Sequence, residues 1–318
     1  MTGKIKLGIS ACLLGEYVRY DGGHAHDRFL TDTLGQFVEY VPVCPEVECG
    51  MPVPREAVRL VGSPGNPRLM TVKTRVDHTE RMQSWAGKRL EALEADDLCG
   101  FIFKSRSPSS GMERVKVYTD AGVTKTGVGI WARMFMEHFP LLPVEDEGRL
   151  HDPGIRENFI ERIFVFMRWR ELIGQGATPG RLVDFHTRHK LLVMAHSPQA
   201  YRALGKLIAE VKTYDTARFI SEYITLLTAA LKMAVTVKKN VNVLNHALHL
   251  MRYFKKQLTK DEKQELIECI EAYHRRYVPL IVPITLINHY VRKYGQPYLV
   301  QQHYLNPHPL ELALRNHV

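Results

Sequence analysis

The sequence predicts an α/β N-terminal domain with a mainly parallel sheet, followed by an all-α C-terminal helical domain. Short β-like runs alternate with helical patterns over the first 150 residues, whereas long helical periodicities begin near Asn158. A joint rich in proline and acidic residues lies between the two regimes, from Leu141 to Asp152. Because 318 residues also exceed the usual size of one hydrophobic core, we expect two domains, residues 1–148 and residues 149–318.

Four strands are expected in the first domain, each a short run rich in apolar or β-branched residues: 4–10, 37–43, 100–104 and 114–118. Helical spacing of apolar residues predicts two helices, 78–93 and 129–139. Ligands of parallel sheets bind beyond the carboxyl ends of the strands. The loops that follow the first three strands, "SACLLG", "CPEVECG" and "KSRSPSSGMER", are therefore expected to converge on one crevice.

The second domain is expected to consist of long helices, and the periodic segments are 157–173, 180–196, 198–211, 216–258 and 260–277. The positive charge is concentrated there, since residues 151–318 hold 24 Lys and Arg against 14 Asp and Glu, a net of +10 that leaves −1 for residues 1–150. This excess favours a polyanionic partner, nucleic acid rather than membrane, although a solvated basic surface is the alternative. Four cations of the long segment are the candidates for RNA phosphate binding: Lys238, Lys239, Arg252 and Lys256. His186 and His189 have helical spacing, and we expect neutral or phosphate-facing histidines rather than a metal pair.

The five cysteines are an odd number in a chain without a secretory signal, which favours free thiols or metal ligands over a disulfide framework. Single cysteines at separate strand ends suit an iron–sulfur cluster better than a zinc site, which favours paired spacing. The alternative is that they are buried small residues. No apolar stretch reaches the length of a membrane span, so we expect a cytoplasmic protein without a membrane partner.

Three motifs of the first domain together resemble the thiouracil desulfidase (TudS) family: "ISACLLGEYVRYDGG", "PVCPEV" followed by "PRE", and "FKSRSPSSGMERVKVY". The rest of the chain resembles the YbgA-like domain that is often fused to it. In this combination the chain is similar to two-domain desulfidases that convert 4-thiouridine in tRNA to uridine. The resemblance implies a [4Fe-4S] cluster held by three cysteines, with a fourth iron that takes sulfur from a thiocarbonyl carbon.

Position by position, Cys12 and Cys44 match the cluster ligands of that family. Its third ligand falls at position 110, where this sequence has Ser110. We predict that Cys49 substitutes, because it belongs to the same loop as Cys44; Cys99 and Ser110 stay open as alternatives.

The resemblance also implies roles for polar residues of the three motifs. Glu46 matches a glutamate used for proton transfer, and Ser107 matches a serine needed for activity, although Ser107 could also be a turn serine before Pro108. Six further residues are expected to bind substrate, the first three by closing over the base and the others by offering groups to an anion: Arg19, Tyr20, Asp21, Ser109, Ser110 and Arg114.

The leading hypothesis is an iron–sulfur-dependent, non-redox desulfidase that replaces C=S by C=O in 4-thiouridine of tRNA. The catalytic domain comes first and the RNA-binding domain second. One rival is a desulfidase of free thiouracil or thiouridine nucleosides. A rival of another class is a cluster-bearing nucleic-acid-binding protein without turnover.

Overall fold

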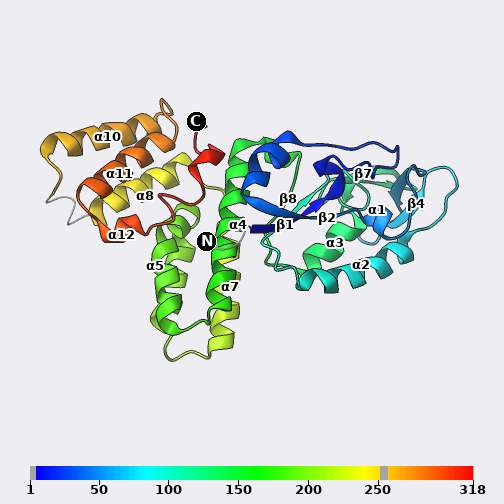
Figure 1. The fold of residues 1–318 in the computed structure, drawn as a ribbon, viewed down its shortest axis with the longest axis horizontal. Helices are drawn as coiled ribbons and strands as arrows, with labels where there is room; N and C mark the ends of the chain where they lie inside the picture. The colour runs from blue at the N-terminus through cyan, green and yellow to red at the C-terminus, as the bar shows by residue number, and fades with distance from the viewer. Residues whose placement is uncertain (1–4, 251–256, 318) are drawn as a thin grey trace. The chain divides into compact units, whose positions relative to one another are not determined.

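The computed structural model describes residues 5–250 and 257–317, with side chains left out at 247–250. Its contacts divide the chain into two compact units, Met1–Ile155 and Arg156–Val318. The first unit contains two sheets and their covering helices, and the second is helical (Figure 1). These findings confirm the predicted fold class.

The first sheet of the first unit is entirely parallel. Its strands run in the order β2 (Val38–Val43), β1 (Ile5–Ser10), β5 (Phe101–Phe103) and β8 (Val144–Asp146). Every residue of β5 is buried, as expected for a central strand covered on both faces. The two helices α2 (Thr79–Glu94) and α3 (Ile130–His138) lie together below these strands in Figure 1. The ring of Phe135 on α3 packs 4.6 Å from that of Phe101, which ties α3 to the sheet.

A second, mixed sheet was not predicted. It runs in the order β4 (Arg68–Thr71), β3 (Val58–Val61), β6 (Val115–Thr119) and β7 (Gly122–Gly127), with β3 and β6 parallel and the two outer pairs antiparallel. The run expected at 114–118 is therefore a strand, β6, but it joins this second sheet. One face of the sheet buries Leu60 and Val117 against Met82 of α2.

Short helical turns fill the connections of the first unit: η1 (Ala11–Leu14), the π-helical turn η2 (Phe29–Thr33), η3 (Leu34–Gln36), α1 (Pro45–Glu48) and η4 (Arg149–His151). The segment expected to be only a joint between domains contributes β8 and η4. Its three-residue strand is too short to stand out as a periodic pattern in the sequence.

The described part of the second unit contains no strand. Its helices are α4 (Pro153–Gly174), α5 (Pro179–His196), α6 (Pro198–Ala209), α7 (Thr216–Leu231), α8 (Val237–Leu250), α10 (Lys260–His274), α11 (Ile281–Lys293) and α12 (Pro297–Val300), followed by the turn η5 (Leu310–Leu312). The rings of Trp169 on α4 and Tyr223 on α7 stack at 5.5 Å in the core of this unit. None of the described helices combines the length and apolarity needed to cross a bilayer.

The long helical segment expected at 216–258 is not continuous, because α7 ends at Leu231 and α8 begins at Val237. The hydroxyl of Thr236 accepts a hydrogen bond from Lys239 N–H at 3.3 Å and so begins a new helix. The imidazole Nδ1 of His196 lies 2.8 Å from the carbonyl oxygen of Met233 in the same break. Helix α11 was not predicted at all.

Candidate active site

The carboxyl ends of three parallel strands meet at one pocket of about 450 Å³. The lining includes Cys12, just after β1, and Cys44 and Glu46, just after β2. Ser107 and Ser110 line it from the loop after β5. The expected convergence of the three loops on one crevice is confirmed.

Two thiols face this pocket. Burial raises the pKa of Cys12 to about 11, although the nearby ammonium of Lys104 lowers it in part. Burial, followed by the negative charge of Glu46, raises the pKa of Cys44 to about 12. Both side chains are thus protonated at neutral pH without a cation, and a bound metal would have to release those protons.

A one-turn helix positions the acidic residues. Cys44 is the residue before α1, and its N–H donates to Glu48 Oε1 at 2.9 Å. Glu48 also pairs with Arg89, at 3.2 Å between carboxylate oxygen and guanidinium nitrogen. Glu48 therefore serves the backbone of the turn, and Glu46 is the acid that lines the pocket.

The carboxylate of Glu46 lies among a thiol, a hydroxyl and a guanidinium. The Cys44 thiol is 3.7 Å from Glu46 Oε2, and the Ser109 hydroxyl donates to Glu46 Oε1 at 2.5 Å. The Arg55 guanidinium is 3.8 Å from Glu46 Oε2, with the Arg55 and Glu46 side chains only 7% and 14% exposed. Arg55 also donates to the carbonyl of Val18 at 2.9 Å, which fixes its position. The guanidinium therefore lies beside the carboxylate of Glu46 inside a largely buried site.

The two serines form a hydrogen-bonded chain that ends on Glu46. The hydroxyl oxygen of Ser107 accepts from the N–H groups of Ser109, at 3.3 Å, and Ser110, at 3.1 Å. The hydroxyls of Ser107 and Ser109 are 2.9 Å apart. Because Ser109 uses its one hydroxyl proton toward Glu46, Ser107 must be the donor in this pair. The chain therefore carries hydrogen bonds in one direction, from Ser107 to Ser109 to Glu46.

Two glycines permit the tight packing of this serine loop. A Cβ on Gly111 would lie 2.7 Å from the carbonyl oxygen of Ser107, and one on Gly129 would lie 2.4 Å from that of Ser109. Gly129 N–H donates to the carbonyl of Gly111 at 2.8 Å. The start of α3 is thereby packed directly against the loop that carries the serines.

The structure does not bring Cys49 together with Cys12 and Cys44. Its thiol packs in the hydrophobic cluster with Met51 and Leu60, and it does not line the pocket. Cys44 precedes the one-turn helix α1 in an extended conformation and Cys49 follows that helix, so sharing a loop with Cys44 does not mean sharing its direction. This placement argues against our choice of Cys49 as the third ligand.

Of the two alternatives, one lies at the wrong end of the sheet. The N–H of Cys99 donates to the carbonyl of Lys6 near the start of β1, whereas Cys12 follows the end of that strand. Ser110, by contrast, lines the pocket and is 3% exposed. Of the candidate cluster ligands, the pocket thus holds Cys12, Cys44 and Ser110.

The other expected substrate residues are divided between two places. Arg19 and Tyr20 line the pocket, and Tyr20 is 46% exposed at its rim. Asp21 does not line it, and instead pairs with Arg19 at 3.2 Å and accepts from Gly23 N–H at 3.1 Å. Arg114 lines a neighbouring pocket.

Lys104 is a lining residue that the sequence reasoning missed. Its ammonium contacts Glu147 Oε1, and Glu147 also accepts from the Ser105 hydroxyl at 2.7 Å. The available signal was its position directly after a fully buried strand, at the end where ligands bind. Lys104 brings positive charge toward Cys12.

The basic candidates of the second unit have different surroundings. Lys238 is exposed. Lys239 is occupied, because its ammonium donates to the carbonyls of His196 at 2.7 Å and Ala234 at 2.8 Å. Arg252 and Lys256 lie outside the described residues.

The histidine pair is internal. The imidazole of His186 lies 3.1 Å from the hydroxyl of Tyr223, and His189 stacks on Phe185 at 4.0 Å. Burial lowers the pKa of His186 to about 4 and that of His189 well below its usual range. Both are neutral at physiological pH, and both are buried.

No group of three or more His, Cys, Asp or Glu side chains in the described parts of the chain gathers as a site for a metal ion. The pocket suits a larger, sulfur-rich group better than a single ion, since its soft donors are two thiols on separate strand ends. The donor set fits such a group through Cys12 and Cys44, and its third member is the harder oxygen of Ser110.

Comparisons with known proteins agree with the two-unit organisation. Residues 7–147 match the family model of 2-thiouracil desulfurase, and residues 190–309 match that of DUF1722, a protein of unknown function. The chain is 31% identical over 156 residues to the uncharacterized protein YbgA of Escherichia coli (strain K12), covering 49% of this chain and 90% of YbgA.

A solved structure titled as the [4Fe-4S]-dependent thiouracil desulfidase TudS shares 30% sequence identity, with a TM-score of 0.39 over 47% of this chain and 95% of the other. The chain therefore belongs to the family of YbgA, and it joins a 2-thiouracil desulfurase region to a DUF1722 region.

Proposed function

We propose that the protein is an iron–sulfur-dependent desulfidase that converts 4-thiouridine in tRNA to uridine. The observation that carries the proposal is the placement of Glu46, which lies between a pocket thiol and a directed chain of two serines. The match to the 2-thiouracil desulfurase family supports a thiolated pyrimidine as the substrate.

The cofactor of this proposal is the [4Fe-4S] cluster expected from the sequence. Cys12 and Cys44 would hold it, and Ser110 is the third donor that the pocket offers. When bound, it would supply an iron without a protein ligand, a Lewis acid able to take sulfur.

The chain's own residues supply the proton transfers. Replacement of sulfur by oxygen consumes one water, whose oxygen ends on the ring carbon while sulfur leaves as hydrogen sulfide. Glu46 accepts a proton from that water and returns it to the leaving sulfur or the ring. The Ser109 hydroxyl and the Arg55 guanidinium hold the Glu46 carboxylate in position for that transfer. Tyr20 and Arg19 lie at the rim, where they would close over the base.

The second unit is proposed to bind the tRNA. Its net positive charge of +10 over residues 151–318 supports phosphate binding that does not depend on sequence. Exposed Lys238 stays a candidate contact, whereas the carbonyls bound to Lys239 argue against a direct role for that residue.

The test compares two neighbouring glutamates in anaerobically purified full-length protein. Glu46→Gln is expected to lower the rate of desulfuration of thiolated tRNA by at least about 100-fold, because general acid–base catalysis contributes on that scale. Glu48→Gln is the matched control, since a glutamine can still accept from Cys44 N–H. The assay follows loss of the thiouridine absorption band, with iron content measured for each protein.

Two outcomes would contradict the proposal. One is a Glu46→Gln protein that turns over at the wild-type rate, which would show that Glu46 does not carry the proton transfers. The other is a wild type that contains no iron yet releases sulfide. A wild type that acts on free 2-thiouracil but not on thiolated tRNA would keep the chemistry and replace the substrate by the free base named in the family description.

A further inference from the structure

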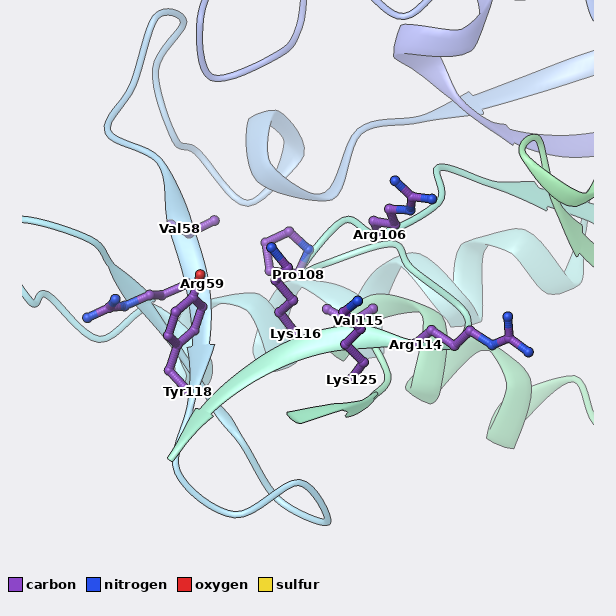
Figure 2. A pocket seen from close by; sticks show the side chains of 9 residues that line it. All are labelled: Val58, Arg59, Arg106, Pro108, Arg114, Val115, Lys116, Tyr118 and Lys125. Carbon is purple, nitrogen blue, oxygen red and sulfur yellow. The ribbon is translucent and has the colours of Figure 1, made fainter. Parts of the chain in front are cut away.

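A second pocket, of about 610 Å³, lies over the mixed sheet of the first unit (Figure 2). Arg59 of β3, Lys116 and Tyr118 of β6, and Lys125 of β7 contribute to its lining. Alternation along the strands explains why they share a face, since Leu60 and Val117 point into the hydrophobic core on the other one. Figure 2 shows Arg106 and Arg114 beside the two lysines.

The lining is strongly cationic. Five of its nine residues are Arg or Lys, and none of the described residues that line it is Asp or Glu. Lys116 and Lys125 are exposed, and within the described residues their ammonium groups have no hydrogen-bond or ion-pair partner. Of the five lining cations, Arg114 alone forms an ion pair among the described residues, with Glu113 at 3.8 Å. Such a concentration of unneutralised charge attracts an anion.

Arg59 is held in place for such a role. Its guanidinium carbon lies 4.6 Å from the ring centroid of Tyr118, a cation–π contact. Its Nε is buried and has no hydrogen-bond partner among the described residues. A phosphate oxygen would satisfy that donor.

This cationic pocket, called the basic pocket below, adjoins the pocket that Cys12 and Cys44 line, called the cysteine pocket. Val58, Arg106 and Pro108 line both of them, so a ligand could occupy the two at once. A uracil base has no charge to place among five cations, whereas a nucleotide carries a phosphate a few bonds from its base.

We propose that the basic pocket binds the phosphate attached to the nucleotide whose thiolated base enters the cysteine pocket. The inference rests on the proposed function and places the phosphate of its substrate, whether of a mononucleotide or of an RNA strand, in the catalytic unit. The catalytic unit would then select a nucleotide over a free base without help from the second unit.

The test measures binding without turnover, using the full chain. In the double variant Lys116→Ala/Lys125→Ala, the dissociation constant for uridine 5′-monophosphate is expected to rise about tenfold, with that for uridine unchanged. A labelled single-stranded RNA oligonucleotide forms the second arm, in which the salt dependence of log K should fall by about two for two lost phosphate contacts. Lys73→Ala/Lys88→Ala is the control, because it removes the same charge from exposed positions elsewhere in this unit.

The two arms separate the sources of the phosphate. Weaker binding of the monophosphate alone assigns the pocket to mononucleotides, and weaker binding of both ligands assigns it to a strand. The proposal is overturned if the Lys116 and Lys125 variant binds both ligands as tightly as wild type, or if the control pair loses as much. No step of this binding test requires sulfur removal. A wild type without desulfidase activity would therefore refute the proposed function, and the binding result would still test the phosphate site.

Discussion

Buried charged groups occur in both units, and those of the first line a pocket. Glu46 and Arg55 line the cysteine pocket together with two thiols. In the helical unit, buried Arg315 donates to Glu161 at 2.8 Å and Glu157 at 3.1 Å, and His196 lies 3.2 Å from Glu161. Burial and charge are thus shared features, and facing a cavity is what distinguishes a candidate site from a structural network.

The helical network also differs in its electrostatics. Burial by itself raises the pKa of Glu161, but the hydrogen bond from His196 and the charge of Arg315 outweigh it and lower the pKa below its usual value. Arg315 further donates to the carbonyl of Tyr304 at 2.6 Å, so each edge of its guanidinium has a partner. These groups stabilise the C-terminal segment on α4.

The largest expected effect separates the pocket cysteines from the core cysteine. Cys12→Ala and Cys44→Ala should lose nearly all iron and activity, because they remove the two soft donors of the pocket. Cys49→Ala should keep its iron, since its thiol lies in the hydrophobic core. Iron analysis and visible absorption of anaerobic protein check this.

Ser110, the third candidate ligand, can be tested by the same measurements. Ser110→Cys would place a third thiol in the lining and should raise iron occupancy above that of wild type. Loss of iron in Cys49→Ala, with unchanged thermal stability, would restore Cys49 as a ligand and contradict its packing in the core.

The next largest effect is expected in the helical unit, where Arg315 pairs with Glu157 and Glu161. Arg315→Leu should lower the free energy of unfolding by about 3–5 kcal/mol, because it leaves the carboxylates of Glu157 and Glu161 buried without their cation. Denaturant unfolding followed by circular dichroism measures the loss. Exposed Arg202→Leu on α6 is the control, and equal stability of the two variants would show that the network contributes nothing.

The third prediction uses pH. Burial lowers the pKa of His186 to about 4, so the unfolded chain binds a proton that the folded chain rejects between pH 6.5 and 4. The contribution of neutral His186 to the free energy of unfolding is present above pH 6.5 and is lost as the pH falls. The free energy of unfolding should therefore decrease by about 2 kcal/mol between pH 7 and pH 5. His186→Leu should remove that part of the decline in the free energy of unfolding.

The control for this titration is an exposed histidine of the same unit, His274→Leu. It should leave the pH dependence of stability as in wild type. If wild type and His186→Leu lose stability in parallel between pH 7 and pH 5, His186 does not titrate as its burial requires.

Patterns that depend on neighbouring residues could be predicted from the sequence. Alternation of strands and helices predicts the parallel strands. The geometry of parallel sheets then predicts that the loops after them converge and bring together Cys12, Cys44 and Glu46. The second sheet could not be predicted, because its strands are short, partly exposed and paired over long distances, as in β3 with β6. The break before α8 could not be predicted for a related reason. The Thr236 hydroxyl caps α8 only because the chain turns at that residue.

Side-chain direction within a single turn was the least predictable feature of the site. Cys44 and Cys49 are close in sequence, yet one thiol faces the pocket and the other faces the core. Likewise, Ser109 and Ser110 were expected to share one substrate-binding role, whereas Ser109 donates to Glu46 and Ser110 lines the pocket. Such differences come from backbone hydrogen bonds, among them those that Ser107 accepts.

The smallest expected effect tests the serine chain itself. Ser109→Ala removes the hydroxyl that donates to Glu46 at 2.5 Å and cuts the connection to Ser107. Because Arg55 still lies beside the carboxylate, we expect only about a tenfold fall in kcat with iron content and KM preserved, the size of one neutral hydrogen bond to a charged group. Ser105→Ala is the control, since its hydroxyl binds Glu147 instead. A Ser109→Ala enzyme as fast as wild type would show that the pocket needs only the carboxylate and the guanidinium. A fall as large as that of Glu46→Gln would instead make the chain of hydroxyls an obligatory route for the proton.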